Sequence, residues 1–173
     1  FATKGRAATK ITDIAKASGM AQGLMYHYYS SKNEIFIELI RHAFERMNTA
    51  VLALEKLDVS PQEKIQLALE NLIDGLDDHE DSGFYHLLIA QATASETIPD
   101  EAKQIIKQKN AIPYEVMVRI IKQGQQEGTI KKFDAHELAL VFWTSVKGLA
   151  IHKATHGAHF KSPDSEILLN MFV

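Results

Sequence analysis

The sequence predicts an all-α fold of about nine helices, with a small N-terminal head and a larger C-terminal helical body. Apolar residues recur at helical spacing along nearly the whole chain, and no alternating run is long enough for a strand. Glycine and proline stand at expected helix ends, without an Asn-Gly hairpin signal. With 46% hydrophobic and 24% charged residues among 173, the composition allows a sizeable core.

Three helices are expected at the N-terminal end. The first covers residues 10–17, where Thr9 is placed as the N-cap and Gly19 as the terminator. The second covers residues 21–28, and the third is a long helix that starts near Lys32. The only plausible domain boundary lies inside this long helix, near residues 44–50. We therefore expect two rigidly joined domains, residues 1–45 and 46–173.

The remaining helices have marked starts and ends. Ser60-Pro61-Gln62-Glu63 predicts a capping box with proline at the first helical position. After it we expect an acidic loop over residues 77–83, in which Glu80 and Asp81 are solvated. A helix is expected over residues 84–95, and Ile98-Pro99 opens another, which Pro113 kinks or restarts. The helix of residues 113–126 ends at Gly128, and the helix of residues 135–156 lies between an Asp134 cap and Gly157. Ser162-Pro163 opens the last helix.

Charge divides the chain into a basic end and an acidic remainder. Residues 1–32 contain five basic residues and one acidic residue, which gives +4; the rest contains fourteen basic and twenty-one acidic residues, which gives −7. Such a division favours a polyanion that contacts one end only. Taken alone, a chance distribution of surface charge explains it about equally well.

Residues 9–29 have the pattern of a helix, a tight turn and a second helix. Ile14, Ala15, Met20 and Met25 supply a small core, and Gly19 permits the positive φ of the turn. The second helix is too short and too polar for a core element, so its other side chains should project outward: Gln22, Leu24, His27 and Tyr28. A helical hairpin packed inside a larger α protein is the alternative, but an outward face of aromatic and amide groups packs poorly.

An exposed helix of this kind fits the major groove of DNA. Gln22 can pair with adenine through two hydrogen bonds, and Leu24 can contact a thymine methyl group. Tyr26, His27 and Tyr28 are long enough to reach phosphates. Lys32, at the start of a helix, adds its charge to the helix dipole in favour of a phosphate.

The head resembles the DNA-binding domain of the TetR family of bacterial transcriptional regulators over about residues 1–45. The resemblance lies in the order and spacing of Gly5, Thr9, Ile14-Ala15, Gly19, Gly23-Leu24-Met25-Tyr26-His27-Tyr28-Tyr29 and Ser31-Lys32. Residues 1–5 resemble the end of that family's first helix, so we expect an incomplete N-terminus. Thr12, Ala21, Gln22 and Leu24 depart from the common pattern, and they leave the operator sequence open.

The resemblance implies a homodimer that binds a near-palindromic operator and is released by a small molecule, which is the behaviour of a ligand-responsive repressor. It places base readout at Thr12, Gln22 and Leu24, with Gly23 allowing close approach of the backbone. It places phosphate contacts at Thr9, Lys10, Tyr26, His27 and Lys32. The alternative is a helical small-molecule-binding protein whose head no longer serves DNA binding. The ligand and the regulated genes stay open.

In the body, two groups of residues are candidates for a ligand pocket. Phe84, Tyr85, Tyr114, Met117, Phe142 and Trp143 lie on separate helices and either line one cavity or form ordinary core. The resemblance favours the cavity, because inducer pockets in this family lie among the middle helices of the body. Four polar residues are candidates to orient a ligand: His86, Gln91, Arg119 and Thr144.

The resemblance also places dimerisation on the helix 135–156 and the last helix. Ser145 and Gly148 are small enough for close helix approach, and His152 is included in the expected dimer face, although a plain buried helix explains the small residues equally well. His152, His156 and His159 are candidate metal ligands, but no carboxylate or cysteine accompanies them at ligand spacing, so we expect no metal.

Other classes of function have little support. There is no nucleophile elbow, P-loop or dinucleotide fingerprint, so we expect neither an enzyme nor a cofactor. The chain contains no cysteine, which fits a reducing, cytoplasmic environment. No apolar stretch approaches the roughly 18 residues of a membrane span, so we expect no membrane partner.

Overall fold

The computed structural model describes residues 1–78 and 83–173, and over these residues it contains helices and no strand, as predicted. The head contains α1 (Gly5–Ala8), α2 (Ile11–Ser18) and α3 (Gln22–Tyr28), followed by the long α4 (Lys32–Glu55). The body contains α5 (Pro61–Asp78), α6 (Phe84–Ala94), α7 (Asp100–Lys109), α8 (Ile112–Glu127), α9 (Ala135–His156), the 3-10 turn η1 (Gly157–His159) and α10 (Ser165–Phe172). Nine of these helices correspond to predicted ones, and the four-residue α1 was not predicted.

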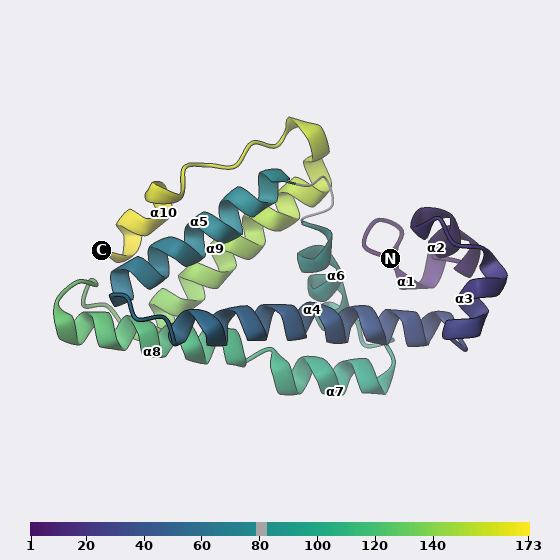
Figure 1. The fold of residues 1–173 in the computed structure, drawn as a ribbon, viewed down its shortest axis with the longest axis horizontal. Coiled ribbons are helices and arrows are strands. Elements are labelled where there is room, and N and C mark those ends of the chain that lie inside the picture. Colours follow the sequence, from purple (N-terminus) through teal and green to yellow (C-terminus); the bar gives the residue numbers. More distant parts are fainter. Residues whose placement is uncertain (79–82) are drawn as a thin grey trace.

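Helix α4 joins the head to the body (Figure 1). Among the described residues, buried apolar side chains form three clusters, and α4 contributes to all of them. Ile35 packs in the head with Ala15 and Met25. Phe44 belongs to a second cluster with α6 and α7, and Val51 to the main cluster with α5, α8, α9 and α10. An unbroken helix shared by three cores is the expected rigid connection.

Several predicted helix ends are confirmed by their hydrogen bonds or backbone angles. The Glu63 backbone N–H donates to Ser60 Oγ at 3.2 Å, and the Ser60 N–H donates to Glu63 Oε2 at 3.0 Å, which completes the capping box. Gly19 ends α2 at φ 67°. Asp134 caps α9 by accepting from the N–H groups of His136 and Glu137.

Two predicted helix starts were wrong. Thr9 does not cap α2, because its hydroxyl is buried and donates to the Gly5 carbonyl at 2.7 Å. The last helix does not begin at Ser162-Pro163. Ser162 Oγ donates to the Ile73 carbonyl of α5, and the helix begins at Ser165 after an Asp164 cap. In both places the hydroxyl of a side chain with the pattern of a helix cap bonds an earlier carbonyl instead, four residues back for Thr9 and 89 residues back for Ser162.

The middle of the body differs from the prediction in smaller ways. Pro113 restarts the helix rather than kinking it, because α7 ends at Lys109 and α8 begins at Ile112, with the proline in its first turn. Residues 77 and 78, predicted to lie in the acidic loop, belong instead to α5, which runs to Asp78. Glu80 and Asp81, predicted to be solvated, lie outside the described residues. None of the described helices is both long and apolar enough to cross a membrane.

Candidate nucleic-acid interface and ligand region

Helix α3 is held to the head by one buried side chain and presents the others outward. Met25 is 3% exposed and packs with Ala15 and Ile35. Exposed fractions of 44%, 53% and 62% are found for Leu24, Tyr26 and Tyr28, large side chains that usually avoid water when they serve only packing. Gln22, Gly23 and His27 are also exposed. The structure therefore brings together on one short helix the six residues predicted to face DNA.

The turn before α3 fixes the direction in which this helix leaves α2. Gly19 adopts the left-handed conformation that its lack of a Cβ permits, and the Met20 N–H donates to the Ala15 carbonyl at 3.0 Å. On α2, Thr12 is exposed, and Lys10 is exposed at its N-cap. These residues can share a ligand surface with α3, because α2 and α3 pack together.

Two residues predicted to contact phosphates serve the head internally. Thr9 is only 3% exposed and its hydroxyl donates to the Gly5 carbonyl, so little of its side chain is available for the predicted phosphate contact. Lys32 is half-buried, and its Nζ donates to the carbonyls of Arg6 (2.8 Å), Ala7 (3.3 Å) and Thr9 (2.8 Å). The ammonium group thereby caps the C-terminal end of α1, where carbonyls lack helical partners.

The other basic residues of the head divide into paired and free cations. Lys4 pairs with Asp13 at 2.9 Å, and hydrogen bonds from the Lys10 backbone and from Lys4 hold the pKa of the Asp13 carboxyl below its usual value. Lys10 and Lys16 are exposed and make no ion pair among the described residues. Lys16 was not among the predicted site residues, although its position on the exposed side of the helix-turn-helix motif could have identified it.

The head is tied to the body by contacts that the sequence does not reveal. Arg6 Nη2 donates to the Thr97 carbonyl, in the turn between α6 and α7, at 2.6 Å. Arg6 Nη1 donates to Asn33 Oδ1 at 2.9 Å. Gln91 of α6 donates to the Ala2 carbonyl at 3.0 Å. The bonds of Arg6 to Thr97 and of Gln91 to Ala2 join residues about ninety positions apart, so a change at the α6–α7 turn has a direct connection to the head.

Three of the aromatic residues predicted for a pocket come together on α8 and α9. Tyr114 lies 6.2 Å from Trp143 and Phe142 lies 5.1 Å from Trp143, measured between ring centroids. Met117, Phe142 and Trp143 are fully buried in the main cluster. Phe84 and Tyr85 lie on α6, and Tyr85 is exposed. The described structure thus places three of the six in the core and leaves Tyr114 at its half-buried edge.

The polar candidates have different surroundings. Gln91 holds the N-terminal segment, Arg119 makes a two-pronged ion pair with Glu55 at 2.6 and 2.9 Å, and the Thr144 hydroxyl donates to the Leu140 carbonyl. Of the four, only His86 has a side chain without a hydrogen bond to another described residue. Burial lowers the pKa of its imidazole, and the positive charge of Lys147 lowers it further.

Acidification should therefore weaken the fold through His86. Its folded pKa lies below the ordinary value of 6.5, so the unfolded chain binds the proton more readily. As pH falls through 6.5, the free energy of unfolding should decrease, and His86→Asn should reduce this dependence. Urea titrations between pH 7.5 and 5.5, with the exposed His42→Asn as the control, measure it. An unchanged slope in His86→Asn would contradict the assignment.

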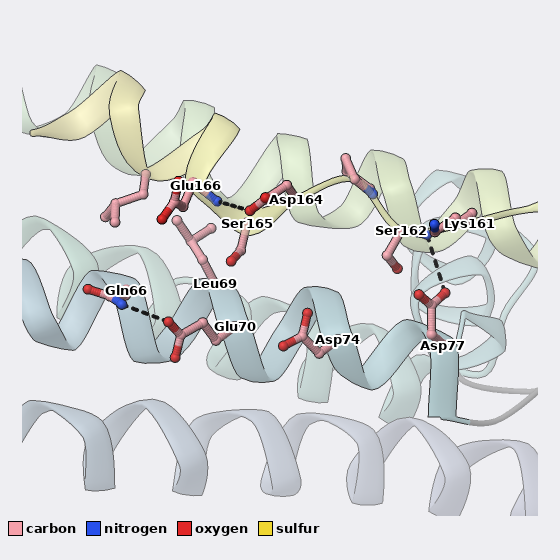
Figure 2. A pocket seen from close by; sticks show the side chains of 12 residues that line it. Gln66, Leu69, Glu70, Asp74, Asp77, Lys161, Ser162, Asp164, Ser165 and Glu166 are labelled. Atoms are coloured by element: carbon pink, nitrogen blue, oxygen red, sulfur yellow. Dashed lines mark hydrogen bonds between the residues drawn. The ribbon is translucent and has the colours of Figure 1, made fainter.

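A groove of about 590 Å³ lies between α5 and the segment that leads into α10 (Figure 2). It is mostly polar and contains none of the predicted pocket residues. Its lining residues are Gln66, Leu69, Glu70, Asp74, Asp77, Lys161, Ser162, Pro163, Asp164, Ser165, Glu166 and Leu169. A second cleft, of about 570 Å³, lies between α6 and α7 and includes Ile98, Ile106, Lys103 and Lys107.

The histidines at the end of α9 do not assemble a metal site in the described residues. His152 and His156 stack with ring centroids 3.8 Å apart, and the His156 ring nitrogen Nδ1 lies 2.9 Å from the His152 carbonyl. No group of three or more His, Cys, Asp or Glu side chains with metal-binding geometry occurs among the residues described.

Comparisons with known proteins identify the head. Residues 1–39 match the family model described as "Bacterial regulatory proteins, tetR family". The HTH-type transcriptional repressor KstR2 of Mycobacterium tuberculosis is 25% identical over 128 residues, which cover 74% of this chain. The match spans 62% of that relative's length.

Solved structures share the fold across nearly the whole chain. The ketosteroid transcriptional regulator KstR2 of Mycobacterium tuberculosis superposes with a TM-score of 0.75, at 20% identity, over 100% of this chain and 89% of that one. FadR from Bacillus subtilis, in complex with stearoyl-CoA, gives a TM-score of 0.71 at 18% identity over 98% and 90%. At these identities the likeness concerns the fold.

Proposed function

This chain belongs to the TetR family of bacterial regulatory proteins through its N-terminal domain, and from this premise we propose that it is a transcriptional repressor released from DNA by a small molecule. The observation that carries the proposal is the exposed face of α3. Leu24, Tyr26 and Tyr28 are held outward by a helix anchored through Met25 alone. Such a face suits the major groove and does not suit packing inside this chain.

The proposed DNA contacts follow the described surface. Thr12, Gln22 and Leu24 read bases, and Gly23 allows the backbone to approach. Lys10, Tyr26, His27 and Tyr28 contact phosphates, with the exposed Lys16 as an addition. Lys32 and Thr9 act indirectly, because they hold the α1 carbonyls that position the head.

The proposed assembly is a homodimer formed through α9 and α10. Leu140 on α9, together with Ile167 and Met171 on α10, is exposed, so a second copy has apolar surface to cover. The two helices touch at Phe142 and Phe172, whose ring centroids lie 5.9 Å apart, while α10 packs mainly on α5. Ser145, Gly148 and His152 of α9 belong to the same proposed face. A dimer presents two copies of α3. A palindromic operator requires two such helices, because its half-sites lie about one helical turn apart.

We assign DNA binding to residues 1–45 and effector binding to residues 46–173. We place the protein in the cytoplasm. Support for an effector comes from the relatives: FadR was solved with stearoyl-CoA, and KstR2 is described as a ketosteroid regulator. We propose an apolar small molecule that binds beside Tyr114 and Trp143. Its binding would alter the α6–α7 turn, which Arg6 links to the head.

Selection of bound duplexes from a random pool tests the proposed function. We expect an inverted repeat with half-site centres about 10–10.5 base pairs apart. Enrichment of no sequence by folded protein at low salt would contradict the proposal. It would instead favour a helical small-molecule-binding protein whose head no longer binds DNA.

Gln22→Ala should relax the sequence preference without removing DNA binding. The amide can make two hydrogen bonds to one adenine, so its loss should cost about 1–3 kcal/mol of discrimination at one base pair. Competition between the selected duplex and its single-base variants measures the effect. Gln126→Ala, an exposed glutamine of α8, is the matched control and should leave the preference unchanged. Equal preferences in the two variants would remove Gln22 from base readout.

A further inference from the structure

Two polar side chains of α8 and α9 bond each other in the body, and a third lies on α6, which packs against α9. They are His86 of α6, Tyr114 of α8 and Lys147 of α9, and each is half-buried. Lys147 Nζ donates to the Tyr114 hydroxyl oxygen at 3.0 Å and lies 4.8 Å from the centroid of the same ring. The charge of Lys147 is close enough to His86 to lower the pKa of its imidazole.

These groups are rich in unused hydrogen-bond donors. An ammonium group has three N–H donors, and Lys147 directs one of them to Tyr114. Because the Tyr114 oxygen accepts this bond, its own O–H remains free to donate. Burial favours the neutral imidazole of His86, which still carries one N–H. Within the described part of the chain, none of these remaining donors has an acceptor.

The charge of Lys147 is also uncompensated. Some other cations of the body are neutralised by carboxylates, such as Arg119 by Glu55 at 2.6 Å and Lys109 by Glu45 at 3.2 Å, while the buried Lys64 and Lys153 are not among them. Lys147 has no carboxylate oxygen within 4.0 Å among the described residues. A half-buried cation without a counter-charge is a favourable place for an anion.

Aromatic side chains lie directly behind the cluster, and two of them, Phe142 and Trp143, are fully buried. The Tyr114 ring lies 6.2 Å from Trp143, which in turn packs against Phe142 at 5.1 Å, measured between centroids. The Trp143 indole N–H donates to the Pro113 carbonyl at 3.0 Å, so the indole offers no polar group to a ligand. A molecule seated here meets donors and a positive charge at one end and aromatic rings at the other.

We propose that His86, Tyr114 and Lys147 bind the anionic group of an apolar effector, a carboxylate or a phosphate. Lys147 supplies the charge, Tyr114 and His86 supply additional hydrogen bonds, and the apolar part of the effector lies against the aromatic residues of α8 and α9. This assignment rests on the proposed function only in calling the ligand an effector. It excludes a neutral hydrocarbon or a cation as the preferred ligand.

Binding can be followed through Trp143, the only tryptophan in the sequence. The purified protein is titrated with hexadecanoate, hexadecanoyl-CoA and hexadecan-1-ol while indole fluorescence is recorded. The two anions are kept below their critical micelle concentrations and the alcohol below its solubility limit. The acid and the thioester share the chain but carry carboxylate and phosphate charge, and the alcohol carries none. We expect at least one anionic compound to bind, and the alcohol to bind about 10-fold or more weakly.

Substitution of Lys147 links this preference to the site. Lys147→Met should weaken the anion about 10- to 100-fold, whereas Lys147→Arg, which keeps the charge, should lose only a few-fold. Lys122→Met removes an equal charge from the exposed surface of α8 and is the control. A loss confined to the acid supports a carboxylate ligand, and a loss confined to the thioester supports phosphate.

Three results would overturn the proposal: no binding of either anion, equal binding of the alcohol, or equal losses in Lys147→Met and Lys122→Met. Circular dichroism verifies that each variant is folded, and Lys147→Arg keeps the test decisive if the methionine variant is not. DNA binding is measured separately without any ligand. A protein that binds the anion but no DNA would contradict the proposed repressor and leave this site intact.

Discussion

Phe44→Ala should lower the free energy of unfolding by about 3–5 kcal/mol, because it removes a large side chain from a closely packed core. Phe44 is 0% exposed and packs in the cluster that α4 forms with α6 and α7. Neighbours on rigid helices relax only partly into the resulting cavity, so the cost exceeds that of the transferred surface alone. Urea denaturation followed by circular dichroism measures the difference.

Phe133→Ala provides the comparison for this prediction. Phe133 is 63% exposed, so the same substitution there should change the free energy of unfolding by about 0.5 kcal/mol or less. Similar effects of the two substitutions would mean that α4 does not pack on α6 and α7 as described. The rigid connection between head and body would then lose its basis.

Lys32→Met should weaken DNA binding at least about 10-fold by loosening the head. The Lys32 ammonium donates to three carbonyls at the end of α1, and a hydrogen bond to a charged group contributes about 1.5–3 kcal/mol. Without these bonds, the short α1 loses its connection to the start of α4. Hydrogen exchange of α1 amides and anisotropy titrations with the selected duplex give the two readouts.

Lys16→Met separates this role from a simple loss of charge. Lys16 is exposed on α2, so its replacement removes the same positive charge and leaves the α1 carbonyls capped. It should reduce the salt slope of binding by about 1 or less without changing exchange in α1. If both variants lost the same affinity and neither altered exchange, Lys32 would act as a phosphate contact, as its position in the sequence suggests.

Local patterns predicted most of the helices because their causes are local. The capping box at Ser60 and Glu63 and the left-handed glycine at position 19 each need only residues a few positions apart. Ser162 was predicted wrongly for the converse reason, because it has the pattern of a helix cap, yet its hydroxyl bonds the Ile73 carbonyl 89 residues away. Thr9 was predicted wrongly because its hydroxyl bonds back to the Gly5 carbonyl of the preceding helix, a local alternative that the pattern does not distinguish from a cap.

The outward residues of the proposed DNA-binding surface could be predicted where they lie within the helix-turn-helix motif. The spacing around α3 identified its outward residues, since one short helix determines which of them face away from Met25. Arg6 was missed because its partner lies 91 residues away, and Lys147 because a lysine in an apolar helix has no local signal. The identities of the six pocket candidates predicted neither their burial nor their separation into core and edge, which depend on how α6, α8 and α9 pack.

The measurement that tests the central claim most directly is an anisotropy titration of the selected duplex at several salt concentrations. We expect saturation at two chains per duplex, with log K falling by about 0.9 for every phosphate neutralised as log salt rises. Such a slope would reflect the exposed cations and the α3 face acting on a polyanion. A folded protein that shows no saturable binding even at the lowest salt, or binding that does not depend on salt, would contradict the account.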